Sequence, residues 1–511
     1  MERLKRLSSI GIALSSESNL EKLLEMIVDE ARNFTNADAG SLYLRQDDQL
    51  HFAIVHNSTL GVRMGGASGH EISWPAIPLY VDGKPNTANV CAFAAINRRI
   101  VNIPDVYNAP GFNFEGTRIF DARSGYRSQS YLTVPLCDHE NQVIGVLQLI
   151  NAKDNADVIP FDVELEPLVA SLASQAAVAL TNAKLIRDTK ALFESFVKVM
   201  ATAIDERSPS TAGHIKRVTD ITLALALAVN EINEGKYANT YFDEDQINEM
   251  RIAAWMHDVG KVTTPIHIIE KRMKLEAIFD RIEMVRLRIE LCKQQKINDY
   301  LRMCLHICKP GDDDVQTSIA QSEKDLKVEL ARLDDDMAFL VEMNKSCEFV
   351  PPPKIDKLHE IASRTYCLQG EPQPLLTSDE LENLSVTRGN VTGEQLAIMR
   401  EHADVTIKLL QQIPFTRKLS AVCEIAGGHH EKLNGKGYPL HLKAEQIPIQ
   451  TRMITIADIY EALTARDRSY KKERTPQEAL RILGFMAADG EIDAELLRIF
   501  QEKVVPNIVC L

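Results

Sequence analysis

The sequence lacks any hydrophobic run long enough to span a membrane. The longest nearly pure apolar segment is Ile221–Val229, whereas a membrane helix needs about 20 apolar residues. The N-terminal segment contains Arg3, Lys5 and Arg6 but no small-residue cleavage site after a clean apolar stretch, so we expect no signal peptide. We therefore expect a cytoplasmic protein without a membrane span.

Cysteine is scarce, and its distribution excludes a disulfide framework. The 9 cysteines are scattered along the chain and their number is odd. Disulfide-rich secreted domains carry paired cysteines at regular spacings in short chains. The pattern is typical of a reduced, cytoplasmic protein.

Positive charge is in deficit, which excludes broad nucleic-acid binding. The chain has 58 Lys and Arg against 72 Asp and Glu, a formal net charge of −14. A nucleic-acid backbone would be repelled overall, so we expect no nucleic-acid partner. A small anionic ligand needs only local basic groups, which Lys261, Arg468 and Lys471 provide.

The first 186 residues alternate between helical and strand-like patterns. Residues 17–36 repeat apolar side chains at helical spacing, which predicts an amphipathic helix. A second helix is expected to begin near Val163. Strand-like stretches lie between the two helices, at residues 41–44, 51–57, 100–103, 131–136 and 143–151. A helix, antiparallel strands and a helix indicate an α+β sandwich of the sensory kind.

Two of these stretches carry a family resemblance. Residues 125–136 and 143–151 resemble the GAF family, and the likeness extends over about residues 15–186. Asn151, Lys153 and the pair Phe161-Asp162 loosely resemble the signature of GAF domains that bind cyclic nucleotides. A strand end followed by a turn and a helix N-cap is the alternative interpretation. The resemblance implies a sensor, and because GAF domains bind many ligands or none, the GAF ligand is unknown.

Residues 165–204 contain no glycine and only one proline, Pro167 near the start. This predicts one long helix. Its apolar stripe is Leu168, Leu172, Ala176, Ala179, Ala183, Ile186, Phe193, Phe196 and Met200. Such a stripe stays exposed unless a partner covers it. We expect a parallel homodimer through this helix; folding of both domains back over the stripe is the alternative.

Five histidines and two aspartates stand out in otherwise apolar helical segments. They occur in the order His214, His257-Asp258, His402, His429-His430 and Asp458. Neutral imidazole nitrogen and anionic carboxylate oxygen are metal ligands, and a carboxylate can bridge two cations. Alone, the His257-Asp258 pair also fits a surface helix end with Gly260 as its C-cap. Burial by chance explains one histidine pair but hardly all five histidines.

The order of these residues, with Gly437-Tyr438-Pro439 between His430 and Asp458, resembles the HD-GYP family of the HD phosphohydrolase superfamily. The likeness covers about residues 190–271 and 391–511. It implies a centre of two divalent ions, iron or manganese by analogy. His214, His257, Asp258 and Asp458 would hold one ion and His402, His429 and His430 the other, with Asp258 bridging. We expect two ions rather than three, because Ser210 stands where three-metal relatives have a Glu.

The resemblance also implies the reaction. Relatives hydrolyse cyclic di-GMP to pGpG and then GMP. Asp258 would act at the catalytic centre, Lys261 would neutralise the phosphate or protonate the leaving oxygen, and Arg468 and Lys471 would bind the phosphate. The spacing from Asp458 to Arg468 is one residue longer than in some relatives. Cyclic GMP-AMP is an alternative substrate, and a non-catalytic cyclic-dinucleotide receptor is the alternative class of protein.

The sequence thus predicts a multi-domain protein. Residues 272–391 interrupt the catalytic motifs with two long helical patterns that indicate an antiparallel hairpin. This hairpin and the Gly-Tyr-Pro loop are the candidate surfaces for a protein partner. The expected segments are a GAF domain with its N-terminal helix (1–186), a connecting helix (187–205), an all-α HD-GYP domain in two pieces (206–271 and 392–511) and the helical-hairpin insertion (272–391).

Overall fold

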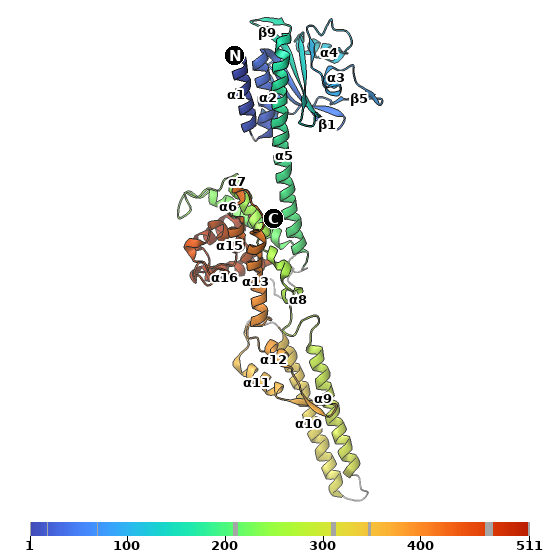
Figure 1. Ribbon diagram of the computed structural model, residues 1–511. Helices are drawn as coiled ribbons and strands as arrows, with labels where there is room; N and C mark the ends of the chain where they lie inside the picture. Colours follow the sequence, from blue (N-terminus) through green and yellow to red (C-terminus); the bar gives the residue numbers. More distant parts are fainter. Residues whose placement is uncertain are drawn as a thin grey trace. The chain divides into compact units, whose positions relative to one another are not determined.

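The computed structural model of the protein describes residues 2–17, 19–68, 70–207, 213–307, 313–345, 349–465 and 474–508. Contacts between Cα atoms divide the chain into two compact units, Met1–Phe193 and Glu194–Leu511. Figure 1 shows the elements of each unit.

The first unit is built on an antiparallel sheet with the strand order β3-β2-β1-β9-β8-β7, in which β4 also pairs with β2 and β10 with β9. The central strands β1 and β9 pair from Ala37 opposite Ala152 to Leu44 opposite Gly145. The strands of the sheet are β1 (Ala37–Gln46), β2 (Gln49–Asn57), β3 (Val62–Gly65), β4 (Ile77–Pro78), β7 (Val101–Ile103), β8 (Tyr131–Cys137), β9 (Val143–Asp154) and β10 (Asp157–Ile159). A separate hairpin joins β5 (Tyr80–Val81) and β6 (Lys84–Pro85). The predicted α+β fold is confirmed.

Helices cover both faces of this sheet (Figure 1). On one face lie α1 (Glu2–Ser16), α2 (Leu20–Thr35) and the first part of α5 (Glu166–Asp205), and on the other lie α3 (Val90–Asn97) and α4 (Glu115–Ser124). Short 3-10 turns are η1 (Gly66–Ser68) and η2 (Val163–Leu165). Leu14, Leu23, Leu42, Leu147 and Leu172 are fully buried in the core between sheet and helices. Each contributes about 1.5–3 kcal/mol by burial.

The residues that resemble a nucleotide-binding signature hold the sheet and a turn together. The side-chain oxygen of Asn151 accepts from the Gln129 amide at 2.7 Å. Lys153 forms an ion pair with Asp38, and Asp162 accepts from the Glu164 amide at 3.0 Å as the N-cap of η2. These contacts match the alternative of a strand end followed by an N-cap.

The apolar stripe of α5 is divided between two environments. Its first part, from Leu172 to Ala183, is buried in the core of the first unit. Ile186 and Phe196 are exposed. A charge at Leu172 would therefore destabilise the first unit itself, so the expectation that one continuous stripe faces a partner is wrong for this part.

One helix among the described residues is long and apolar enough to cross a membrane by length and composition. It is Val163–Asp205, with a window of mean hydropathy 1.3, of which 44% is buried within the protein. A core helix of a folded domain meets the same criteria. The absence of a membrane span stays a prediction.

The second unit is a helical domain assembled from two parts of the chain. The part before the insertion forms α6 (His214–Asn230), α7 (Glu244–Met256), η3 (Val259–Thr263) and α8 (Ile266–Ile269). The part after it forms α13 (Gly393–Leu410), η4 (Arg417–Leu419), α14 (Val422–Gly427), η5 (Ala444–Gln446), α15 (Ile449–Thr464), α16 (Pro476–Ala488), α17 (Ala494–Ile499), η6 (Phe500–Val504) and α18 (Val505–Ile508). Helix α15 packs on α6, α6 on α7, and α13 on η3. The two parts therefore interleave.

The insertion forms a helical hairpin with a core of its own. Helices α9 (Ile282–Ile307) and α10 (Asp313–Asn344) lie side by side (Figure 1), and the ion pairs Lys293–Asp334 and Lys296–Glu329 fix them antiparallel. The sequence did not predict the elements that follow, α11 (Pro352–Ala362), the β11 (Thr365–Leu368) and β12 (Glu371–Pro374) hairpin, and α12 (Ser378–Leu384). They pack on α9 and α10 through leucines such as Leu340, Leu358 and Leu375.

Two buried lysines join the ends of the insertion. Lys271 Nζ donates to the side-chain oxygens of Asn383 and Gln395, both at 2.7 Å. Lys274 Nζ donates to the backbone oxygen of Val386 at 2.7 Å. Gln395 also completes the N-terminal capping box of α13. The entry and exit of the insertion are thus held against each other next to a helix of the helical domain.

Candidate metal centre

The seven predicted ligands come from helices and helix ends of the second unit. His214 is the first residue of α6, and His257 and Asp258 follow α7 directly. His402 lies within α13 and Asp458 within α15. His429 and His430 follow Gly428, the C-cap of α14. Helix ends and helix interiors thus place these seven side chains on rigid elements, and the side chains converge on one point.

The carboxylate of Asp258 lies at that point, between two groups of imidazoles. Its Oδ2 atom is 3.5 Å from His214 Nε2 and 3.3 Å from His257 Nε2. Its Oδ1 atom is 3.6 Å from His402 Nε2 and 3.8 Å from His429 Nε2. One carboxylate thus presents one oxygen to each group, which is the geometry of a bridging ligand.

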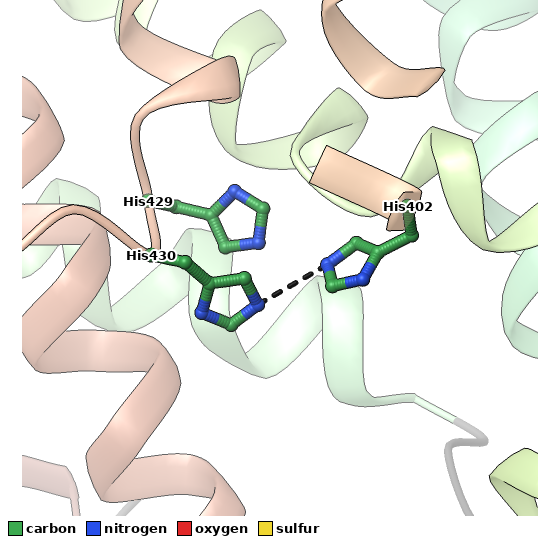
Figure 2. A group of neighbouring side chains, drawn as sticks. All are labelled: His402, His429 and His430. Carbon is green, nitrogen blue, oxygen red and sulfur yellow. Dashed lines mark hydrogen bonds between the residues drawn. The ribbon is translucent and has the colours of Figure 1, made fainter. Parts of the chain in front are cut away.

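The remaining ligand atoms form two triads. His214, His257 and Asp458 offer atoms within 4.8 Å of one another, and so do His402, His429 and His430. We call these the carboxylate triad and the histidine triad. Figure 2 shows the three rings of the histidine triad converging, with His430 Nε2 and His402 Nε2 facing each other at 3.1 Å. Each triad can hold one cation, with Asp258 shared.

Most of the rings are oriented by backbone carbonyls. The Nδ1 atoms of His257, His402 and His429 face the oxygens of Ala254, Met399 and Ala426 at 2.7, 2.6 and 2.7 Å. Each Nδ1 therefore carries the proton and donates, which leaves Nε2 as a neutral ligand atom.

The unsatisfied ring atoms fit a metal. Among the described residues, the Nε2 atoms of His214, His257 and His429 are buried without a hydrogen-bond partner. Buried polar atoms without partners are costly, and a ligand removes that cost. Seven nitrogen and oxygen donors in this arrangement suit two divalent transition-metal ions.

The electrostatics differ between the triads. Burial opposes the charged form of His214, but the nearby carboxylates of Asp258, Asp458 and Glu461 outweigh it and raise the pKa of His214 well above its ordinary value. Burial lowers the pKa of His430 to about 3. Burial also lowers the pKa of His429, and neighbouring His430 adds to the effect. The rings of the histidine triad are thus neutral and ready to bind metal at neutral pH.

Lys261 lies at the centre, as predicted. Its Nζ atom is 2.6 Å from Asp258 Oδ2. Burial would raise the pKa of Asp258, but Lys261 and the imidazoles around it hold that pKa well below its usual range. The other two predicted phosphate-binding residues, Arg468 and Lys471, lie outside the described residues, as does Ser210.

A pair of residues behind His214 was not predicted from the sequence. The buried carboxylate of Glu461 is hydrogen-bonded to His214 Nδ1 and accepts from Arg217 Nε at 2.7 Å. His214 is thus backed by a charged carboxylate instead of a backbone oxygen. A signal existed: Arg217 lies three residues after His214, and Glu461 three after Asp458, so each pair shares a helix face.

The tyrosine of the Gly-Tyr-Pro loop has a role that the sequence did not indicate. The Tyr438 ring stacks on the ligand ring of His430, with centroids 4.7 Å apart and planes at 30°. The guanidinium of Arg400 lies over the same tyrosine ring, 5.2 Å from its centroid. The loop therefore orients a residue of the histidine triad.

A third contact that was not predicted joins the two halves of the domain. A Cβ atom on Gly260 would lie 1.9 Å from the backbone oxygen of His402. Thr406 Oγ1 accepts from the Gly260 amide at 3.0 Å and donates to the His257 carbonyl at 3.1 Å. Glycine is required here because the backbone next to His257-Asp258 touches the backbone of the helix that carries His402.

Comparison with known families agrees with this architecture. The GAF domain family matches residues 19–180, and the HD domain family matches residues 377–496. The chain therefore has an N-terminal GAF domain and a C-terminal HD domain.

Related proteins include phosphodiesterases of two specificities. The chain is 38% identical over 110 residues to a probable cyclic di-GMP phosphodiesterase of Vibrio cholerae, covering 20% of this chain and 24% of that protein. It is 38% identical over 90 residues to 3'3'-cGAMP-specific phosphodiesterase 2 of the same organism, covering 18% and 17%. It is 33% identical over 117 residues to a cyclic di-GMP phosphodiesterase of Pseudomonas aeruginosa, covering 23% and 27%. The chain thus spans about a quarter or less of these relatives' own lengths.

Proposed function

We propose that the protein is a metal-dependent phosphodiesterase that hydrolyses cyclic di-GMP to pGpG or GMP under the control of its GAF domain. The observation that carries this proposal is the position of Asp258, with one oxygen toward each triad. The kinship of the HD domain with cyclic-dinucleotide phosphodiesterases supports it.

In this proposal, seven residues hold the two metal ions, and Lys261, Arg468 and Lys471 act on the phosphate. His214, His257 and Asp458 would hold one divalent ion, His402, His429 and His430 the other, and Asp258 both. Two such ions supply an activated water and neutralise charge on the phosphate. Lys261, 2.6 Å from Asp258, donates a proton to the leaving 3′-oxygen or neutralises the phosphate. Arg468 and Lys471 bind the phosphate in this proposal.

The donor set favours particular ions. Five imidazoles and two carboxylates suit iron or manganese, the metals we propose, and they also bind zinc or nickel. Two ions per chain are expected.

The specificity of the relatives makes cyclic GMP-AMP a second candidate substrate. Relatives with each specificity match at similar identity. A non-catalytic cyclic-dinucleotide receptor is the third candidate, and the complete set of seven ligand side chains argues against it.

One experiment separates the three candidates. The full-length protein is loaded with iron or manganese, its metals are counted, and cyclic di-GMP and cyclic GMP-AMP are assayed side by side. We expect about two ions per chain and faster hydrolysis of cyclic di-GMP. His257→Ala is the test variant, and His267→Ala is the matched control because His267 is exposed on α8 outside both triads. Binding of either dinucleotide without turnover would favour the receptor.

We further propose that the protein is a parallel homodimer through α5. Val178, Leu185, Leu192 and Val199 are exposed on α5, and each follows the last by seven residues. A seven-residue repeat is the period of a left-handed coiled coil. Asn182 lies between the first two at the alternate core position, where a single Asn favours a parallel pair in register.

Light scattering tests the dimer. Leu185→Glu combined with Leu192→Glu should shift the protein toward monomer, whereas Lys184→Glu, a charge change outside the repeat on the same helix, should not. A wild-type monomer at micromolar concentration contradicts the proposal.

The cytoplasm is the proposed location of the protein. The hairpin of α9 and α10 and the Gly-Tyr-Pro loop are the proposed surfaces for a protein partner.

A further inference from the structure

Arg400 is an exposed cation at the edge of the candidate metal centre. It lies in α13 two residues before the ligand His402. Its guanidinium is 5.2 Å from the centroid of the Tyr438 ring, which is 4.7 Å from that of the His430 ring. These two distances place the guanidinium within about 10 Å of a metal-ligating ring.

Two other cations beside the centre, among the residues that the structure describes, have carboxylate partners. Lys261 pairs with Asp258 at 2.6 Å, and Arg217 pairs with Glu461 at 2.7 Å. Arg400 forms no ion pair with any residue that the structure describes, and its guanidinium contacts the face of Tyr438. Its charge is therefore available to an anion that enters the centre.

The tyrosine holds this charge in place. A guanidinium over an aromatic face is stabilised by about 0.5–1 kcal/mol at an exposed site. Stacking also restricts the arginine to fewer rotamers before a ligand binds, so binding costs less side-chain entropy. The planar group keeps its edge N–H donors free for two parallel hydrogen bonds to phosphate oxygens. The ammonium group of a lysine lacks this planar fork of N–H donors and cannot form the same two parallel hydrogen bonds.

The substrate class requires such a group. A cyclic dinucleotide carries two phosphodiesters, and one two-metal centre holds only the one that is cleaved. The second is an anion that enters the site at the same time and loses water, and a buried or half-buried anion without a cation is unfavourable. We propose that Arg400, held on Tyr438, binds this second, uncleaved phosphodiester. The inference rests on the proposed function.

A comparison of two substrates tests this role. Cyclic di-GMP has two phosphodiesters, and bis(p-nitrophenyl) phosphate has one. Arg400→Gln should raise the KM for cyclic di-GMP about tenfold, equivalent to about 1.4 kcal/mol, with a smaller change in kcat. The loss of kcat/KM on cyclic di-GMP should exceed the loss on bis(p-nitrophenyl) phosphate about tenfold. Arg400→Lys, which keeps the charge but not the fork, should fall between wild type and Arg400→Gln.

The control is a second arginine on an aromatic ring. Arg481 lies over Phe485 at 5.6 Å on α16, which carries none of the seven ligands. Arg481→Gln should leave the ratio of the two substrates unchanged, and thermal melts should show that both variants remain folded. Equal losses on the two substrates, or no loss on either, would overturn the inference. A wild-type protein that cleaves neither substrate would instead overturn the proposed function.

Discussion

The carboxylate triad and the histidine triad are neighbours that differ in charge. The carboxylate triad contains Asp458, and its His214 is backed by Glu461, itself paired with Arg217. The histidine triad contains three imidazoles, of which His402 and His429 are backed by backbone oxygens. Besides Asp258, the first triad contains one carboxylate and has a second directly behind it, whereas the second triad contains no carboxylate and Asp458 acts on it only from the neighbouring triad.

This difference predicts two unequal metal sites. Anionic ligands and a carboxylate behind an imidazole increase electron donation to a cation. The carboxylate triad should therefore bind the first ion, and more tightly. The histidine triad should bind the second ion and depend more on Asp258 for charge neutralisation.

The largest effect is expected when the shared carboxylate is removed. Asp258→Ala should lower kcat about a thousandfold or more, since it removes a ligand of both ions and several kcal/mol of transition-state stabilisation. Metal counting should show less than one ion per chain. Wild-type turnover with unchanged metal content would show that Asp258 is not a bridge.

The next effect separates the triads. Asp458→Asn removes the carboxylate that belongs to the carboxylate triad and is not shared with the histidine triad. The ion of the carboxylate triad should then bind more than about a hundredfold more weakly. His430→Ala removes one of three neutral ligands and should affect the weaker site only. Calorimetric titration of metal-free protein with Mn²⁺ checks both; if His430→Ala weakens the first ion more than Asp458→Asn does, the order of loading is reversed.

Removal of the carboxylate behind His214 should have a smaller effect. Glu461→Gln keeps the shape but loses the charge, and partners of this kind contribute about 10–100-fold in metal affinity. The first ion should weaken and the second should not. Glu424→Gln serves as the control in the same titration. It makes the same chemical change at an exposed position of α14 that lies outside both triads.

The smallest effect is a difference in pH dependence. Because the pKa of His214 is raised in the metal-free protein, an ion must displace its proton, so affinity at the carboxylate triad should rise about tenfold per pH unit until pH passes that pKa. The pKa of His402, His429 and His430 is lowered, to about 3 for His430. These rings stay neutral at neutral pH, so affinity at the histidine triad should be flat from about pH 7 to 8. Equal slopes for both ions would contradict the asymmetry.

The sequence predicted the ligands better than what surrounds them. Adjacent His and Asp residues in apolar helices are costly to bury without a ligand, and all seven predicted residues meet in the structure. Glu461 and Arg217 were missed because charged residues on helices are usually solvent-exposed, and only packing of α15 on α6 brings them behind His214. Arg400 was missed for the same reason: its contact with Tyr438 links positions that are distant in sequence.

In the fold, too, elements set by the local sequence were predicted and features set by tertiary packing were not. Hydrophobic periodicity predicted the main strands of the GAF sheet and the long helices, because local pattern determines those elements. It did not predict that Leu172 faces the GAF core while Leu192 on the same helix is exposed. Both are leucines in one uninterrupted helix, and only the three-dimensional path of the chain distinguishes them.

The closed junction of the insertion bears on how the centre forms during folding. Lys271 and Gln395 are in contact although 124 positions separate them, and His257-Asp258 and His402 lie beyond this contact on either side. Were the insertion an unfolded loop, closing it would cost about 3 kcal/mol more than closing a roughly five-residue turn. Because it has its own core, it can fold early and act as a short connection. A mutation that unfolds the hairpin, such as one at Leu340, would then slow assembly of a metal site that it never touches.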